Sequence, residues 1–288
     1  MKYYYITTKH LENKVWFRDD EDYKVGMNKV ALVSAQLAIR VMAFILMSNH
    51  VHFLIIAHSR QEAELFITSY KNQYSRHVRH KYGINELLRR NDVDIQEIEN
   101  LNEAIERVIA YIQMNCVAAN ICSQPHQYAW GTGNTFFSQI KPKGIRMDKM
   151  PKARRSRILR SKLDIPGEYI LGEDGYILPE SYVDIETVER IFRTANRYNY
   201  FLQSSSKAKR KLETADSGIP AFRDQVVIPC VGELCRSLFQ KASPKELKNE
   251  ELIELLKQLR YRFSSNIQQL ARVSGLTYEE VADKLDSI

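Results

Sequence analysis

The clearest pattern along the chain is a pair of apolar runs separated by a polar dipeptide. Arg40–Met47 and Val51–Ala57 are almost entirely apolar, and Ser48-Asn49 lies between them. Short apolar runs bounded by turn residues are typical of buried strands joined by a tight turn. The pattern therefore predicts a β-hairpin, and we expect the rest of the fold to be organised around it.

The elements on either side of this hairpin are typical of an α+β fold. Lys2–Leu11 begins with aromatic and β-branched residues, which predicts a strand. Asp19–Leu37, with its acidic start, and Gln61–Lys81, followed by Gly83, both predict helices. The order strand, helix, strand, strand, helix accounts for most of a ferredoxin-like unit with an antiparallel sheet.

The remainder of the chain is predicted to be mainly helical. The polar segment Ile84–Asn100 is interpreted as a connector. Leu101–Cys122 carries apolar residues three and four positions apart, which predicts a third helix. Tyr182–Phe201 predicts a further helix, Ser204–Asp216 a polar linker, and Glu250–Ile288 two or three short helices.

Composition divides the chain into three expected parts. The segment Lys141–Lys162 is the most basic of the sequence, and the composition changes after it. We therefore expect a first domain over residues 1–140, a basic linker over 141–166, and a helical accessory region over 167–288. The basic segment is either a solvated linker or a surface that contacts phosphate groups.

The last part of the accessory region, about residues 250–288, has the pattern of a helix-turn-helix. Within Ile267–Ala282, Gly275 separates two stretches of helical composition, and Leu276 and Val281 are spaced to point inward. The second stretch is acidic, and acidic side chains repel phosphate. The pattern therefore fits either a DNA-binding unit or an ordinary helical hairpin.

The charge of the chain favours a polyanionic partner. Its 288 residues carry 42 Lys and Arg against 35 Asp and Glu, a net charge of +7, which favours nucleic acid before a membrane. No apolar run approaches the roughly 20 residues that span a bilayer, and the N-terminus lacks the apolar core of a secretory signal. Four cysteines do not suggest a disulfide scaffold. We expect a cytoplasmic protein associated with the nucleoid.

Two histidines directly after the predicted turn are candidate metal ligands. His50 and His52 are separated by one apolar residue. Residues i and i+2 of a strand point to the same face, so the two imidazoles are expected to project side by side. They either hold a divalent metal together with a third ligand from elsewhere, or they are hydrogen-bonded residues of the sheet.

The third predicted helix offers a nucleophile and that third ligand. Tyr111 and Asn115 are four residues apart and therefore lie on one face of the helix. A tyrosine can attack phosphorus and form a phosphotyrosine ester. The amide oxygen of Asn115 is a suitable ligand for Mg²⁺ or Mn²⁺ beside two imidazoles. A buried polar pair is the alternative interpretation.

At these positions the sequence resembles the REP-associated tyrosine transposases, relatives of the single-tyrosine transposases with an HUH motif. The resemblance covers roughly residues 3–137, and its most specific part is the run Met-Ser-Asn-His-Val-His. The matching stretches are Tyr4–Thr7, Phe17–Tyr23, Leu46–Leu54, Tyr111–Ala119 and Tyr128–Trp130.

The resemblance implies an HUH nuclease fold with assigned chemical roles. It implies that His50 and His52 bind the metal ion, that Tyr111 is the nucleophile, and that Asn115 is the third ligand. The family usually has proline after this asparagine, where Cys116 stands here.

A second departure from the family concerns DNA recognition. The family's Gly/Phe/Arg-rich segment between the second and third helices is missing, and Ile84–Asn100 stands in its place. This departure concerns which bases are read. The expected contacts with the DNA phosphates come from positively charged residues of the second helix and of the basic segment: Lys71, Arg76, Arg79, Arg154, Arg155 and Arg157.

The expected function is that of a transposase for DNA transposition and recombination. The protein would nick single-stranded or hairpin DNA, form a 5′-phosphotyrosine at Tyr111, and rejoin it to a 3′-hydroxyl, acting as a monomer or a homodimer. One alternative is a DNA-binding regulator that kept the fold and lost catalysis. Another is a metal-dependent nuclease that uses water. A covalent protein–DNA adduct distinguishes the first function from both alternatives.

Overall fold

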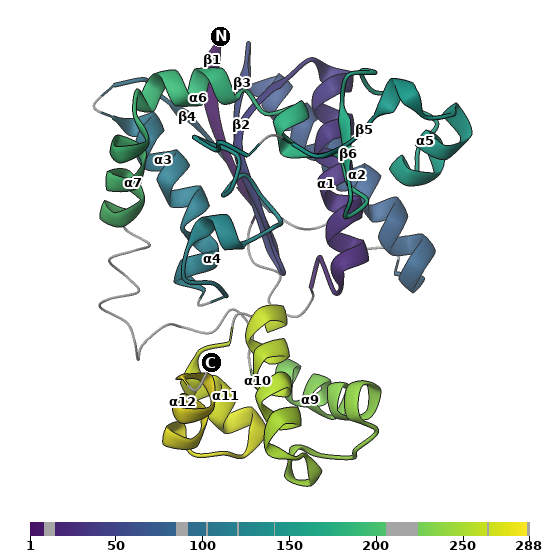
Figure 1. Cartoon of the computed structure of the whole chain (residues 1–288), viewed down its shortest axis with the longest axis vertical. Helices are drawn as coiled ribbons and strands as arrows, with labels where there is room; N and C mark the ends of the chain where they lie inside the picture. Colours follow the sequence, from purple (N-terminus) through teal and green to yellow (C-terminus); the bar gives the residue numbers. More distant parts are fainter. Residues whose placement is uncertain are drawn as a thin grey trace.

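A four-stranded antiparallel sheet forms the centre of the N-terminal part of the molecule (Figure 1). The computed structural model describes residues 1–8, 15–84, 92–101, 103–119, 121–140, 142–205, 224–263 and 265–286. The strands lie in the order β2-β3-β1-β4, and both β1 and β2 pair with β3 in antiparallel fashion. Their bounds are Lys2–Thr8 (β1), Arg40–Met47 (β2), His50–Ala57 (β3) and Val93–Ile98 (β4).

The strand β4 corrects the interpretation of Ile84–Asn100 as a connector. It pairs along β1 at the edge of the sheet and completes the ferredoxin-like unit. Its apolar and polar residues alternate weakly because the strand lies at the edge of the sheet, where half of its residues are exposed and only Ile95 is buried. Residues 85–91 of the same segment lie outside the described part of the chain.

Two helices, α1 (Asp20–Leu37) and α2 (Arg60–Tyr82), pack on one face of the sheet (Figure 1). The backbone N–H of Asp22 donates to the carboxylate of Asp19, which caps α1 as its acidic start predicted. Gly83 ends α2 with a positive φ of 68°, a conformation that glycine adopts without a steric cost. Both helix predictions are confirmed.

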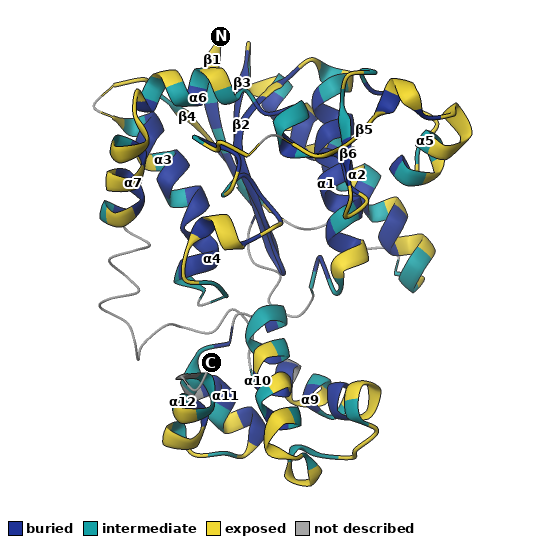
Figure 2. Ribbon diagram, viewed as in Figure 1, coloured by how far each residue is buried: buried dark blue, intermediate teal, exposed yellow. Residues whose placement is uncertain are grey.

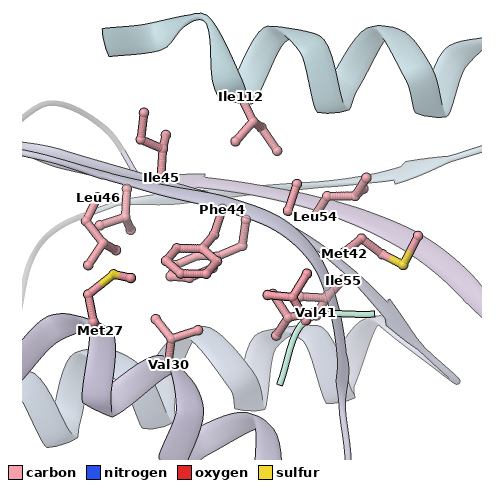
Figure 3. Packing of buried hydrophobic residues seen from close by; sticks show 14 of the residues in the cluster. Met27, Val30, Val41, Met42, Phe44, Ile45, Leu46, Leu54, Ile55 and Ile112 are labelled. Atoms are coloured by element: carbon pink, nitrogen blue, oxygen red, sulfur yellow. The ribbon is translucent and has the colours of Figure 1, made fainter. Parts of the chain in front are cut away.

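The opposite face of the sheet is covered by α3 (Ala104–Gln113). Figure 3 shows Ile112 of this helix over Ile45 and Leu54, while Phe44 points to the other face, where Val30 of α1 lies. All residues of β2 and β3 except Arg40 are buried, and Figure 2 shows these strands as continuously dark. A hydrophobic core therefore fills both sides of the sheet.

The predicted helix Leu101–Cys122 is interrupted at Met114 and resumes as the single turn α4 (Asn115–Ala118). The side-chain Nδ2 of Asn115 donates to the carbonyl oxygens of Tyr111 and Ile112, at 2.9 and 3.3 Å. Side-chain bonds of this kind compete with the backbone bonds of a helix. The asparagine therefore explains the interruption, and the single predicted helix was wrong at this point.

Residues 142–205 pack onto the first core. Met147 and Leu159 are buried in it, although they lie in the segment interpreted as a basic linker, where charged residues obscure the apolar pattern. The predicted helix Tyr182–Phe201 is two helices, separated at Arg193, whose φ is 67°. The elements of this region are β5 (Gly144–Arg146), α5 (Lys152–Leu159), β6 (Ile170–Gly172), α6 (Ile185–Phe192) and α7 (Ala195–Ser204).

A second core is formed by the C-terminal helices. It joins α9 to three later helices and is separate from the first core. The hydroxyl of Tyr261 accepts a hydrogen bond of 2.8 Å from Nε1 of Trp130, which links the two regions. The helices are α9 (Asp224–Phe239), α10 (Asn249–Phe263), α11 (Ile267–Ser274) and α12 (Tyr278–Asp286).

The sequence predicted α10 to α12 as two or three short helices, which is confirmed, but it did not predict α9. Gly275 separates α11 from α12 with a φ of 75°. The predicted linker Ser204–Asp216 lies almost wholly outside the described residues. The domain boundaries and the DNA-binding role of the last two helices stay predictions.

No helix in the described ranges is long and apolar enough to cross a membrane. The same ranges contain four short 3-10 helices. They are Pro125–Gln127 (η1), Met147–Lys149 (η2), Pro179–Ser181 (η3) and Pro244–Glu246 (η4).

Candidate active site

The register of the sheet places polar side chains in a row on the face that α3 covers. Thr7 of β1 lies directly opposite His52 of β3 and, on its other side, opposite Asp94 of β4. Directly paired residues of antiparallel strands point to the same face. The residue two positions earlier on β1, Tyr5, shares this face and lies opposite Leu54.

The two histidines lie side by side at the start of β3, as their spacing predicted. Their ring centroids are 4.8 Å apart and their planes are nearly perpendicular, at 87°. Both side chains are buried. Nδ1 of His50 lies 2.8 Å from the amide oxygen of Asn49, and Nδ1 of His52 lies 2.8 Å from the hydroxyl of Tyr5. A proton on each Nδ1 would leave each Nε2 with the lone pair that can bind a metal.

Tyr5 connects the histidines to the tyrosine of α3. Its ring stacks on that of His52, with centroids 5.9 Å apart, and meets the ring of Tyr111 edge-on at 6.2 Å. Burial raises the pKa of Tyr5 above its usual value, and the negative charge of an ionised Tyr111 would raise it further. The Tyr5 hydroxyl therefore stays protonated around neutral pH.

Tyr111 projects from α3 toward the histidines. Its ring lies edge-on to that of His52, with centroids 5.9 Å apart and planes at 88°. It is half-buried, whereas the neighbouring Ile112 is fully buried against the sheet. The packing of Ile112 fixes the rotation of the helix, and this rotation places Tyr111 over the row of polar side chains.

Asn115 lies one turn beyond Tyr111 and is buried. Because its Nδ2 donates to two carbonyl oxygens of its own helix, its Oδ1 is the atom able to act as a ligand. Among the described residues, no three His, Cys, Asp or Glu side chains gather as a metal site. Two imidazoles and an amide oxygen are the donor atoms that the sequence predicts for a metal ion, and the Nδ1 contacts of His50 and His52 fit a metal bound through Nε2.

A cleft of about 640 Å³ opens beside these side chains, and it shows residues that the sequence reading missed. The sequence predicts Tyr5 to lie in the first strand and in one of the matching stretches but indicates no role for it, because the role depends on the pairing of that strand with β3. Asp92 and Asp94 lie in the segment that was interpreted as a connector, so the sequence did not indicate them as part of the site. The cleft is lined by Tyr5, Thr7, Thr8, His52, Asp92, Val93, Asp94 and Tyr111.

The six predicted DNA-binding residues lie on two helices, away from the α3 face. Lys71, Arg76 and Arg79 are on α2, and Arg154, Arg155 and Arg157 are on α5. Burial lowers the pKa of Lys71, while the negative charge of Asp92, which lines the cleft, acts in the opposite direction. Arg155 pairs with Asp164 at 3.1 Å, and Arg79, Arg154 and Arg157 are exposed.

Residues 1–115 match the protein family described as "Transposase IS200 like". No curated protein matches the chain. A similar solved structure is that of a REP-associated tyrosine transposase bound to a REP hairpin. It is 13% identical in sequence, with a TM-score of 0.37, and the alignment covers 46% of this chain and 76% of that chain.

The α+β fold with its four-stranded antiparallel sheet, together with the family match of residues 1–115, is that of HUH enzymes, which nick DNA. The likeness to the IS200-like transposases covers residues 1–115 of the 288. The members of this family are DNA transposases and generally use a divalent metal ion.

Proposed function

We propose that this protein is a metal-dependent endonuclease and strand transferase for single-stranded or hairpin DNA, with Tyr111 as its nucleophile. The observation that carries the proposal is the edge-on contact of Tyr111 with His52, with both side chains lining one cleft. A nucleophile beside a metal-binding group is the arrangement that phosphoryl transfer requires. The net charge of +7 supports a polyanionic substrate.

In the proposed reaction the phenol oxygen of Tyr111 bonds to the phosphorus of one phosphodiester. The bond from phosphorus to the 3′ oxygen breaks, so the 5′ end of the DNA becomes a phosphotyrosine. The phenol loses its proton, and the departing 3′ oxygen gains one. Attack by a 3′-hydroxyl on the phosphotyrosine reverses these steps and joins the strands. The ester retains the energy of the broken bond, so rejoining needs no external source of energy.

His50, His52 and the Oδ1 of Asn115 would hold the metal, for which we propose Mg²⁺ or Mn²⁺. When bound, the ion polarises the scissile phosphate and stabilises charge on the departing oxygen. Tyr5 orients His52, because its hydroxyl lies 2.8 Å from Nδ1. As an acceptor from Nδ1–H, that hydroxyl selects the tautomer whose Nε2 carries a lone pair.

The later parts of the chain are proposed to add DNA affinity without adding chemistry. The described residues place Arg154 and Arg157 exposed on α5, where they can contact phosphate groups. The division into residues 1–140, 141–166 and 167–288 is kept here as a functional one. We propose that the protein acts as a monomer or a homodimer.

The test is to incubate the protein with a panel of single-stranded hairpins and Mn²⁺ and to look for a slowly migrating covalent adduct. The expected adduct survives denaturation and is absent with Tyr111→Phe. Cleavage without an adduct would identify a nuclease that uses water. Tight binding with neither cleavage nor adduct would identify a regulator. Either result would reject the proposal.

A further inference from the structure

A cavity of about 580 Å³ lies on the side of the molecule opposite α3, between α1, α2 and the segment that follows α5. Figure 1 shows α5 beside these two helices and across the sheet from α3. Half of its lining residues are basic, and none of the described residues that line it is acidic. The lining comprises Lys29, Gln73, Arg76, Ser156, Arg160, Ser161, Lys162 and Leu163.

Lys29 is the most unusual residue of this cavity, because its side chain is only 3% exposed. Its ammonium group donates to the carbonyl oxygens of Leu159 and Arg160, at 2.8 and 3.2 Å. Burial, and then the positive charges of Arg160 and Arg76, lower its pKa to about 8. A buried cation that faces two more cations is costly unless an anion offsets their charge.

The chain segment after α5 is folded so that it presents further donors to the cavity. Arg160 has a positive φ of 46° and turns the chain at the end of α5, so that Ser161 and Lys162 follow along the cavity wall. The guanidinium of Arg160 is held by an ion pair with Glu21 and by a 2.6 Å contact with Nδ1 of His77. These contacts hold the guanidinium of Arg160 in place. The same side of the cavity also carries two serine residues.

We propose that this cavity is a phosphate-binding site for the DNA strand, separate from the cleft at Tyr111. A phosphodiester supplies negative charge that none of the described residues lining the cavity carries, and it accepts hydrogen bonds from arginine, lysine and serine side chains. The inference rests on the proposed function, because DNA is the substrate of that function. Free phosphate has the same chemistry, and the experiment below distinguishes the two sources.

Helix α2 connects the cleft to the cavity. The charge of Asp92, which lines the cleft, acts on Lys71 of this helix, and Gln73 and Arg76, two and five residues further along, line the cavity. A strand that leaves the cleft would cross the surface of one helix, which is about 10 Å wide, before reaching the cavity. The site would therefore hold a phosphate a few nucleotides from the scissile one and fix the direction of the strand.

The test measures DNA binding without metal, so that its result does not depend on chemistry at Tyr111. The variant Arg76→Gln/Lys162→Gln changes two exposed residues of the cavity and should fold. Arg190→Gln/Lys257→Gln removes the same charge from exposed positions elsewhere and is the matched control. We expect the cavity variant to bind a hairpin with a single-stranded flank about tenfold more weakly and with a shallower salt dependence, whereas the control changes affinity by about twofold or less.

A scan of the flank with single neutral methylphosphonates gives the decisive measurement. We expect one substitution, away from the scissile position, to weaken binding to the unmodified protein by about tenfold, and to have almost no effect on the cavity variant. Equal losses for both proteins at every position would overturn the proposal. The two proposals fail separately, because absence of an adduct in the unmodified protein would leave this binding result intact.

Inorganic phosphate provides the remaining arm. If phosphate raises the melting temperature of the unmodified protein more than chloride does at equal ionic strength, the cavity binds the free ion. Loss of that effect in the cavity variant, with unchanged DNA affinity, would assign the cavity to free phosphate and overturn its assignment to DNA. Competition between phosphate and the hairpin in the unmodified protein would support the proposal.

Discussion

The two faces of the central sheet use polar side chains in different ways. On the α3 face, His50, His52 and Tyr111 meet through ring contacts, the two imidazoles bond to the neutral groups of Asn49 and Tyr5, and Asp92 and Asp94 also line the cleft. On the α1 and α2 face, Asp22 and His77 form a buried pair of 2.7 Å. Neutral contacts can be exchanged for a metal ion or a substrate at little cost, whereas a buried ionic network resists change. The first face is therefore suited to chemistry and the second to stability.

The ionic network on the second face joins several segments around Asp22, whose side chain is fully buried. Its carboxylate accepts from the backbone N–H of Arg18, from Lys81 and from the hydroxyl of Tyr82, besides His77. Burial alone would raise the pKa of Asp22, but these hydrogen bonds, that of His77 first, lower it to about 2.

The largest effect is expected from Tyr111→Phe, which changes the chemical face alone. The variant should form no adduct and leave the DNA uncut, while it binds hairpin DNA almost as well as the unmodified protein. It removes one hydroxyl and no positive charge that contacts phosphate. Gel analysis with Mn²⁺ and anisotropy without metal measure the two properties. Undiminished cleavage would exclude Tyr111 as the nucleophile.

His50→Ala and His52→Ala should each lose metal-dependent cleavage by a factor of about 100 or more, because each removes a proposed ligand. His58→Ala is the matched control. His58 lies just beyond the end of β3, and its exposed ring pairs with Glu62 rather than lining the cleft. Initial rates of adduct formation should stay unchanged in the control. A His52→Ala variant with normal rates would refute the proposed metal site.

Asp22→Asn should have the opposite effect, a loss of stability without a loss of chemistry. Breaking a buried ionic network costs about 3 kcal/mol or more, and urea denaturation measures this loss. At low temperature the folded fraction should still form the adduct. Glu64→Gln, in an exposed pair with Arg60, is the control and should change stability very little.

The same comparison predicts the response to acid. The pKa of Asp22 is lower in the folded protein than its usual 3.8, so its contribution is complete above that value and is lost as the pH falls toward 2. Relative to Asp22→Asn, the unmodified protein should therefore lose its advantage in stability between about pH 4 and pH 2. An advantage that persists at pH 2 would contradict this role.

Tyr5→Phe sharpens the comparison on the chemical face, since it removes only the hydroxyl beside Nδ1 of His52. We expect the Mn²⁺ concentration for half-maximal adduct formation to rise about tenfold, with little change in the rate at saturating metal. Tyr3→Phe changes the same strand and face at its far end and is the control. Equal metal requirements in Tyr5→Phe and the unmodified protein would show that Tyr5 does not orient the histidine.

The last effect is expected at Lys29 on the second face, and it depends on pH. Its pKa of about 8 is below the usual 10.5, so the unfolded state binds more protons between these values, and stability rises with pH across that range. Relative to Lys29→Met, the unmodified protein should gain up to about 3 kcal/mol from pH 8 to pH 10.5. Urea midpoints at several pH values measure the difference. A flat difference would mean that the pKa of Lys29 is the same in the folded and the unfolded protein.

The sequence determined the parts of the fold and candidate site that depend on short-range chain geometry. The hairpin followed from two apolar runs, and the shared face of His50 and His52 followed from the period of a strand. The four-residue spacing of Tyr111 and Asn115 likewise fixed their common face. The sequence did not predict the break in the helix at Met114, because the hydrogen bonds from Asn115 to the preceding carbonyl oxygens appear only in the folded helix.

The tertiary structure alone decided features that join distant segments. The edge strand β4 has too few buried residues for a clear pattern, and its pairing with β1 depends on a neighbour almost 90 residues away. Lys29 looks in sequence like any charged residue of a solvated helix. It becomes buried only because carbonyl groups 130 residues later cover it. Contacts of this range depend on the packing of whole elements, whereas residue spacing reports only the local conformation of the chain.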